Sequence, residues 1–167
     1  FAGAAGGLVA KSSDAGSNWT IVRDSLPTAY CSSVKSFEPG TVYATYSRYG
    51  VGKVWRSTDF GNTWININGN LPDVPANDIV RIDGNLIIGT DIGAFISDNE
   101  GASWQRFGTG MASVSVQKLR YNKNTGTLRA ITHGRGMYDM RWTTPVPEVP
   151  RFLSRPDTTL LEMKQPF

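Results

Sequence analysis

The sequence predicts an all-β fold made of repeated four-stranded units, and three observations lead to this prediction. A motif of the form S-x-D-x-G-x-x-W occurs in three copies, and short apolar runs recur around each copy. Gly, Pro, Asn, Asp and Ser separate these runs, as expected for tight turns between short strands. Apolar stripes of helical period and length are absent, so we expect very little helix.

The three motif copies are spaced at the interval that is typical of one β-propeller blade. The acidic position of the motif is Asp14, then Asp59, and then Asn99, which lie 45 and 40 residues apart. The full sets are Ser12, Asp14, Gly16 and Trp19; Ser57, Asp59, Gly61 and Trp64; and Ser97, Asn99, Gly101 and Trp104.

Short predicted strands flank each motif in the same order. Two runs precede each copy, at residues 1–5 and 8–11, 42–46 and 53–56, and 86–90 and 94–97. The motif Trp begins a third run, and a fourth run follows a polar loop, at 33–37, 78–82 and 114–119. A last unit covers 128–132 and 137–142 and has no motif after it. Four strands per unit is the content of a propeller blade, so the sequence predicts a partial β-propeller of about three and a half four-stranded blades.

The chain divides into a propeller portion, residues 1–142, and a Pro-rich C-terminal extension, residues 143–167. Pro145, Pro147 and Pro150 favour extended structure and cannot donate to a strand ladder. The extension is either a flexible tail or a segment whose apolar residues dock on a neighbouring surface.

The number of blades is too small for a closed ring, which usually has four to eight blades. The first repeat also lacks an innermost strand. We therefore expect the ring to be completed by a missing N-terminal propeller portion or by another chain. An open arc would expose two blade faces and their apolar residues.

The chemistry of the motif favours a structural role. A short Asp side chain accepts hydrogen bonds from backbone N–H groups in an Asx-type turn, and the following Gly allows the positive φ of a tight hairpin. The Trp then buries a large ring between strands or blades. The alternative is that Asp14 and Asp59 are catalytic carboxylates or Ca²⁺ ligands, but repetition in every blade is what a requirement of the fold predicts.

Composition excludes several kinds of function. The net charge of +3 comes from scattered residues, so we expect no nucleic-acid partner. No apolar stretch is long enough for a membrane span. His133 is the only histidine and Cys31 the only cysteine, so we expect neither a His-rich metal site nor an internal disulfide, and no cofactor.

The motif copies resemble the Asp-box, also called the BNR repeat. Asp-boxes occur in the propellers of sialidases, xyloglucan-active glycoside hydrolases, sortilin-type ectodomains and photosystem II assembly-factor-like proteins. Residues 89–97, GTDIGAFIS, are similar to the G-T-D-x-G-V-F-x-S that leads into such boxes. Residues 132–138, THGRGMY, resemble the T-x-G-R-G-x-Y/W in the closing blade of secreted bacterial members. The resemblance covers about residues 1–142 and is specific for the superfamily, not for an activity.

Several residues outside the boxes are candidates for a site. Asp91 resembles the acidic T-D-I-G motif of xyloglucanases, although the same phrase also occurs as a turn in non-catalytic propellers. His133 and Arg135 could act together, or lie in a structural turn between glycines. Aromatic and basic residues near the second blade could form a platform for sugar rings or a protein partner: Tyr46, Arg48, Tyr49 and Trp55.

These observations favour a non-catalytic extracellular propeller module that binds a partner protein or a glycan. The expected location is secreted or on the cell surface of a bacterium. The alternative is a fragment of a secreted glycoside hydrolase, xyloglucanase-like or sialidase-like. A sialidase would need three arginines that converge on a carboxylate, a Tyr–Glu pair and an acid, and the sequence does not show that such residues converge.

Overall fold

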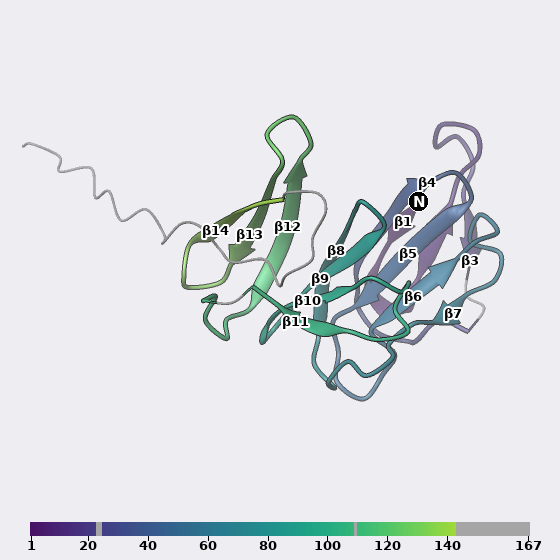
Figure 1. Ribbon diagram of the computed structural model, residues 1–167. Helices are drawn as coiled ribbons and strands as arrows, with labels where there is room; N and C mark the ends of the chain where they lie inside the picture. Colours follow the sequence, from purple (N-terminus) through teal and green to yellow (C-terminus); the bar gives the residue numbers. More distant parts are fainter. Residues whose placement is uncertain (23–24, 109, 143–167) are drawn as a thin grey trace, which may run out of the picture.

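The computed structural model describes residues 1–22, 25–108 and 110–142, and their strands form four antiparallel sheets (Figure 1). The first sheet contains β1 (Ala2–Gly3), β2 (Val9–Lys11) and β3 (Thr20–Val22). The second contains β4 (Cys31–Glu38), β5 (Thr41–Tyr46), β6 (Val54–Ser57) and β7 (Ile65–Asn66). The third contains β8 (Ala76–Ile82), β9 (Asn85–Thr90), β10 (Gly93–Ser97) and β11 (Gln105–Phe107). The last contains β12 (Val116–Asn122), β13 (Thr127–Thr132) and β14 (Met137–Arg141).

Each sheet is a meander in which neighbours in sequence are neighbours in space, and the sheets follow one another along the chain from purple to yellow-green (Figure 1). The two middle sheets have four strands each. The first sheet begins at the strand equivalent to β5, so its innermost strand is missing, as predicted. The last sheet is described as far as the strand equivalent to β6. A 3-10 turn, Ala5–Gly7, is the one helical element in the described residues. The fold is thus the predicted all-β, partial β-propeller of about three and a half blades.

The three Asp-boxes form the same tight turn between the last two strands of a sheet. Two consecutive residues have positive φ in each turn, for example Phe60 at 58° and Gly61 at 78°. In the second box the N–H of Asn62 donates to the Asp59 carbonyl at 3.3 Å, as in a type I′ turn. Positive φ is sterically unfavourable for the non-glycine residue at the first of these positions. The turn therefore depends on hydrogen bonds from the box side chains.

Three apolar clusters join the sheets face to face. Val9 and Val22 of the first sheet pack with Val42 and Ala44 of the second, and the cluster includes Trp64. The second and third sheets meet through a cluster that contains Tyr43, Ile67, Ile88 and Trp104. The third and last sheets meet through Val80, Ile87, Leu119, Leu128 and Met140. Cys31 lies in the first cluster, where burial raises its pKa to about 11.

The strand register makes positions in different sheets directly comparable. Lys35 pairs with Tyr43, and Tyr43 pairs with Arg56 in the second sheet. The corresponding residues are Val80, Ile87 and Ile96 in the third sheet. In the last sheet they are Arg120, Arg129 and Asp139. In the second and third sheets these rows lie on the face turned toward the following sheet, and in the last sheet the row lies on the face turned away from the third sheet.

Candidate functional site

The connections between the second and third strands of successive sheets come together at one end of the innermost strands. Ser47, Asp91 and His133 occupy equivalent positions just after β5, β9 and β13. Each backbone N–H donates to the carbonyl of the residue that precedes the neighbouring inner strand: Ser47 to Tyr30 at 3.0 Å, Asp91 to Pro75 at 3.3 Å and His133 to Ser115 at 2.9 Å. The sequence did not reveal that Asp91 and His133 are equivalent, because their surrounding residues differ.

Asp91 belongs to a polar network that links three sheets at this end. Its Oδ1 accepts hydrogen bonds from Asn77 at 2.9 Å and from the Ser115 hydroxyl at 2.8 Å. Asn77 also donates to the Val116 carbonyl at 3.2 Å and contacts the Ser47 hydroxyl at 3.1 Å. One carboxylate oxygen of Asp91 is therefore used to hold neighbouring sheets together.

The exposed candidates lie in these same connections. Arg48 and Tyr49 follow Ser47, and Tyr49 is among the exposed large apolar side chains. Arg48 donates to the Thr28 carbonyl at 3.1 Å. Arg135 is exposed in the connection that begins at His133. Basic and aromatic side chains thus share one end of the sheet array with Asp91.

The β5–β6 connection is fixed by a buried lysine. Lys53 is 2% exposed and pairs with Asp73, whose carboxylate also accepts from the Gly50 N–H at 2.8 Å. Lys53 and the Gly50 hydrogen bond keep the pKa of Asp73 below its usual value. The loop that carries Arg48 and Tyr49 is therefore anchored at both its tip and its end.

Two residues expected in an aromatic platform lie elsewhere. Tyr46 is fully buried in the cluster between the first two sheets, so its ring is not on the surface. Burial, with the neighbouring Cys31, raises the pKa of its hydroxyl. Trp55 packs against the same cluster, half-buried, and its indole N–H donates to the Gly52 carbonyl at 3.2 Å. Of the four platform residues, the structure leaves Arg48 and Tyr49 exposed.

The hydrogen bonds of the Asp-box side chains are internal to the turn. Asp59 accepts from the Thr63 N–H at 2.8 Å and from the Thr63 hydroxyl at 2.8 Å, and Ser57 accepts from the Gly61 N–H at 2.8 Å. The bonds that Asp59 accepts from Thr63, that of the N–H first, and from the Ser57 hydroxyl lower its pKa to about 2. Asp14 has a pKa of about 2 for the same reason, with Asn18 as the main donor.

Asn99 reproduces this turn without a charge. Its Oδ1 accepts from the Ser103 N–H at 2.9 Å, and its Nδ2 donates to the Ser103 hydroxyl at 2.8 Å. The Ser97 hydroxyl accepts from the Gly101 N–H at 2.9 Å, as in the other boxes. The geometry therefore supports the structural interpretation of the boxes.

Asp78 is a buried carboxylate that sequence reasoning missed. It is 0% exposed on β8, and its Oδ1 contacts Lys35 of β4 at 2.7 Å and accepts from Ser33 at 2.8 Å. Its Oδ2 accepts from the Leu119 N–H of β12 at 3.0 Å. Burial alone would raise the pKa of Asp78, but these partners hold it below its usual value. One carboxylate thus connects the innermost strands of three sheets, and only its position in space reveals this.

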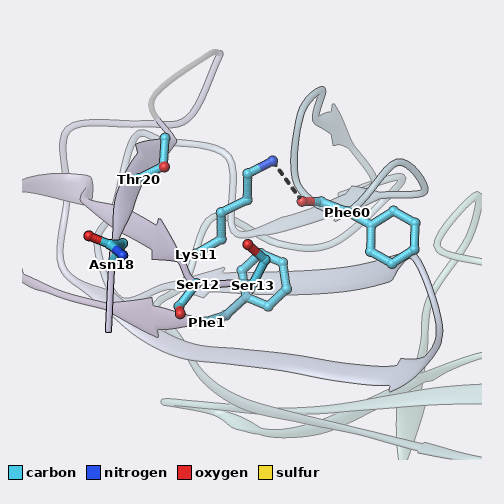
Figure 2. A pocket seen from close by; sticks show the side chains of 7 residues that line it. All are labelled: Phe1, Lys11, Ser12, Ser13, Asn18, Thr20 and Phe60. Atoms are coloured by element: carbon cyan, nitrogen blue, oxygen red, sulfur yellow. Dashed lines mark hydrogen bonds between the residues drawn. The ribbon is translucent and has the colours of Figure 1, made fainter. Parts of the chain in front are cut away.

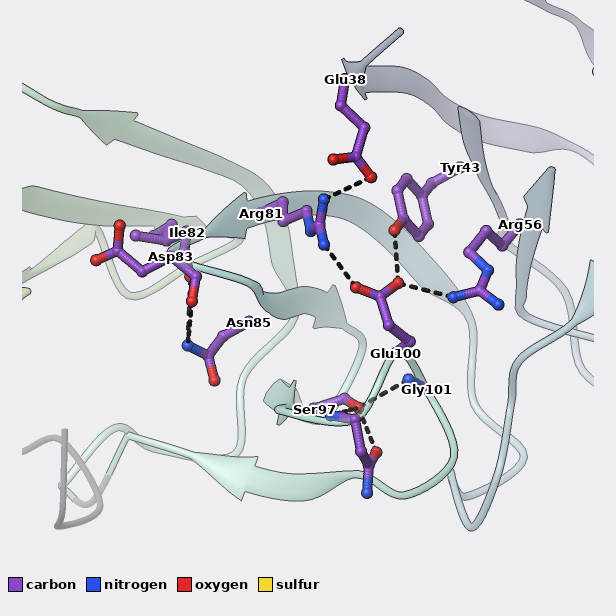
Figure 3. A network of polar contacts seen from close by, with 11 residues as sticks. Glu38, Tyr43, Arg56, Arg81, Ile82, Asp83, Asn85, Ser97, Glu100 and Gly101 are labelled. Atoms are coloured by element: carbon purple, nitrogen blue, oxygen red, sulfur yellow. Dashed lines mark hydrogen bonds and ion pairs between the residues drawn. The ribbon is translucent and has the colours of Figure 1, made fainter. Parts of the chain in front are cut away.

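A second network joins the second and third sheets (Figure 3). Glu100, in the third box, accepts from the Tyr43 hydroxyl at 2.8 Å and pairs with Arg56 at 2.9 Å and Arg81 at 2.7 Å. Arg81 also pairs with Glu38 at 2.8 Å. Burial would raise the pKa of Glu100, but the bonds from Tyr43 and Arg56 outweigh it and lower the pKa.

This network has a Tyr–Glu pair and two arginines, which are parts of the sialidase set named above. Here Arg56 and Arg81 are both paired with protein carboxylates. The arrangement therefore joins blades and does not present a cluster of unpaired arginines to a ligand carboxylate.

A pocket of about 480 Å³ lies between the first two sheets (Figure 2). The rings of Phe1 and Phe60 line it together with hydroxyl and amide side chains, among them Ser12 and Asn18. Lys11 crosses it and donates to the Phe60 carbonyl at 3.3 Å. The pocket is a space beside two Asp-boxes, and no candidate from the platform lines it.

The described residues contain no group of three or more His, Cys, Asp or Glu side chains that could hold a metal ion. Among the same residues, no helix is long and apolar enough to span a membrane.

Comparison with solved structures supports the β-propeller fold of the chain. The chain aligns with YCF48 bound to a D1 peptide, with a TM-score of 0.65 and 17% identity, over 93% of this chain and 50% of that one. It aligns with YCF48 from Cyanidioschyzon merolae, with a TM-score of 0.56 and 14% identity, over 85% and 48% of the two chains. A GH74 xyloglucanase from Xanthomonas campestris matches with a TM-score of 0.59 and 12% identity, over 84% and 27%.

These likenesses concern the fold, since every identity is below 20%. The chain spans half or less of the length of each of these propellers. No protein-family profile matches the sequence, and no curated protein matches it.

Proposed function

We propose that this chain is a non-catalytic part of a larger Asp-box propeller, or of an assembly that completes one, and that it binds a partner protein or a glycan. The observation that carries the proposal is the exposure of Trp19. Its equivalents Trp64 and Trp104 are 5% and 3% exposed because each packs against the sheet before its own. Trp19 belongs to the first sheet and is 51% exposed.

The residues around Trp19 on this sheet are also apolar. Ile21, 60% exposed, pairs with Ala10, which in turn pairs with Ala2. In the second sheet the equivalents of Ala2 and Ala10 are Ala44 and Trp55, which pack against the first sheet. This apolar face of Ala2, Ala10, Trp19 and Ile21 therefore matches a surface that a preceding blade covers elsewhere in the chain.

Substitution of Trp19 tests the proposal. The tagged full chain would be purified from its native source and its size measured by light scattering, with Ile65→Ala as a control, because Ile65 is a similarly exposed apolar residue on β7. We expect the wild-type chain and the control to purify in an assembly larger than 18.2 kDa. Trp19→Ala should release the chain from that assembly with little change in melting temperature. A stable wild-type monomer without a partner would contradict the proposal.

Trp64→Ala provides the complementary result. Because Trp64 is buried between the first two sheets, its loss should destabilise the chain by about 3–5 kcal/mol. The contrast between Trp19 and Trp64 would show that the same motif residue acts in assembly at one position and in folding at the other.

The binding surface that we favour is the end that carries Arg48, Tyr49, His133 and Arg135. A tyrosine ring with flanking cations suits both peptide recognition and sugar stacking. One structural neighbour, YCF48, is bound to a D1 peptide, which supports a peptide or protein partner for this chain. The likeness of residues 132–138 to secreted bacterial propellers supports a location outside the cell or on its surface.

The alternative is a fragment of a glycoside hydrolase in which Asp91 is the acid. The GH74 xyloglucanase neighbour favours it at the level of fold. The bonds from Asn77 and Ser115 to Asp91 Oδ1 weigh against it, because they give the carboxylate a structural use. Release of reducing sugar from xyloglucan that is lost in Asp91→Asn, while the melting temperature is kept, would favour the hydrolase. Hydrolysis that survives this substitution would exclude Asp91 as the acid.

A further inference from the structure

The last sheet turns a charged face away from the rest of the array. The alternation of side chains along β12, β13 and β14 puts one set into the cluster with the third sheet and the other set on the opposite side. We call the second set the basic face; it comprises Lys118, Arg120, Arg129, Ile131, Met137, Asp139 and Arg141. A depression of about 690 Å³ lies over the part of this face near the β12–β13 turn, lined by Arg120, Arg129 and Arg141 among others.

The register places like charges in direct opposition on this face. Arg120 pairs with Arg129 across β12 and β13. Arg129 is opposite Asp139 and binds it through two hydrogen bonds, of 2.7 and 2.6 Å. Arg120 is 61% exposed and lies 3.4 Å from the Asp78 carboxylate. That carboxylate already binds Lys35 at 2.7 Å. Opposed like charges destabilise a sheet unless an anion lies near them.

The excess of cations on the basic face equals the formal net charge of the chain. It carries four cations and one carboxylate, an excess of three, and the formal charge of the chain is +3. The other 13 cations are matched by 13 carboxylates, since the chain has 17 and 14. Outside this face, cations and carboxylates are thus equal in number over the sequence.

This face differs from the equivalent face of the third sheet. Arg120, Arg129 and Asp139 correspond to Val80, Ile87 and Ile96. Those three aliphatic residues pack against the last sheet. A following element cannot cover the basic face by apolar packing alone, because that would bury cations without partners.

The second sheet shows how this fold covers such a face. At the same three positions it has Lys35, Tyr43 and Arg56. The next sheet supplies one carboxylate from its inner strand, Asp78, which binds Lys35 at 2.7 Å. It supplies a second from its Asp-box, Glu100, which binds both Tyr43 and Arg56 (Figure 3). A basic blade face in this chain is thus covered by carboxylates that project from two places on the neighbouring element.

We propose that the basic face binds an acidic protein surface, whose carboxylates meet Arg120, Arg129 and Arg141 as Asp78 and Glu100 meet Lys35 and Arg56. The inference deepens the proposed role in assembly and rests on it, but it concerns the opposite end of the array from Trp19. A second copy of this chain is a poor occupant, because the free face of its first sheet is apolar and its box has Ala15 at the position of Glu100.

The test uses the full chain and a short fluorescein-labelled polyglutamate peptide, with a duplex DNA probe of equal charge beside it. Fluorescence anisotropy at low salt should show saturable binding of polyglutamate that weakens as salt is added. The triple variant Arg120→Gln/Arg129→Gln/Arg141→Gln should bind about tenfold more weakly or worse. Arg106→Gln, which removes an exposed cation from β11, should bind like the wild type.

Two further measurements keep the test decisive. Arg141→Glu changes one exposed residue at the end of β14, so its folding can be checked by melting temperature and its binding should fall further than that of Arg141→Gln. Equal binding of polyglutamate by wild type and triple variant would overturn the inference, as would tighter binding of the DNA probe. Either failure leaves the Trp19 result unaffected, so failure here and failure of the proposed assembly are distinguishable.

Discussion

At the scale of single residues, the Asp-box is a turn whose side chains accept hydrogen bonds from the backbone N–H groups of a strained segment. Phe60 and Gly61 both have positive φ, and Asp59 and Ser57 hold them through bonds to backbone N–H groups. Asn99 performs the same task in the third box with a neutral amide. The carboxylate is therefore needed for its acceptor oxygens more than for its charge.

The pH dependence of stability tests this conclusion. The pKa of Asp59 falls from 3.8 to about 2 on folding, so its contribution to stability is complete above pH 3.8 and is lost as the pH falls toward 2. Asp59→Asn should keep most of the stability at neutral pH, because Asn99 shows that an amide fits this turn.

The variant should also lose less stability than the wild type between pH 3.8 and about 2. Urea unfolding at several pH values measures both effects. An unchanged acid slope, compared with Asp14→Asn as a second box variant, would mean that Asp59 does not contribute through its charge.

At the scale of elements, the box glycines differ in how closely the preceding sheet approaches them. Gly16 and Gly101 have similar φ values of 93° and 88°. A Cβ on Gly101 would lie 2.7 Å from both the Cβ and the carbonyl oxygen of Ile67, whereas one on Gly16 would meet nothing closer than Trp19 at 3.7 Å. The third box is pressed against a neighbouring sheet, and the first box is open.

Alanine at the two glycines should therefore have unequal effects. Both substitutions carry the cost of positive φ, about 1–2 kcal/mol. Gly101→Ala should lose clearly more free energy of unfolding than Gly16→Ala, because the backbone of Ile67 must move. Urea unfolding of the two variants gives the comparison, and equal losses would show that the sheets separate easily at the third box.

At the scale of the whole molecule, the two ends of the array are chemically unlike. We expected an open arc to expose apolar residues at both ends. The first sheet does so through Trp19 and Ile21, but the last sheet presents arginines at the positions where the third sheet has Val80, Ile87 and Ile96. The last sheet does expose Met137, but its arginines were not foreseen, because which residues share a face depends on pairing register, including the bulge between Val116 and Lys118.

Much of the fold was predictable because its signals are local. Ser57 and Asp59 each bind a backbone N–H four residues further on, so the turn is determined by a short stretch of sequence. The apolar runs on either side of the motif predict the strands, and the spacing of the repeats predicts the blades. The candidate residues Arg48, Asp91 and His133 could be named from the sequence, but not grouped. Their common location follows from hydrogen bonds between strands that lie far apart in the chain.

The sequence by itself determined the unit of this protein: a four-stranded blade closed by a self-satisfied turn, repeated along the chain. The tertiary structure decided the roles of residues that look alike in the sequence. Trp19 and Trp64 occupy the same place in the same motif, yet a sheet covers only one of them. Asp78 lies outside every motif and Glu100 fills a variable position of its box, and both matter because packing brings cations from other sheets to them. The hydrogen bonds of a turn join residues that are close in the sequence. Burial and charge pairing depend instead on residues of the neighbouring blade, which are far away in the sequence.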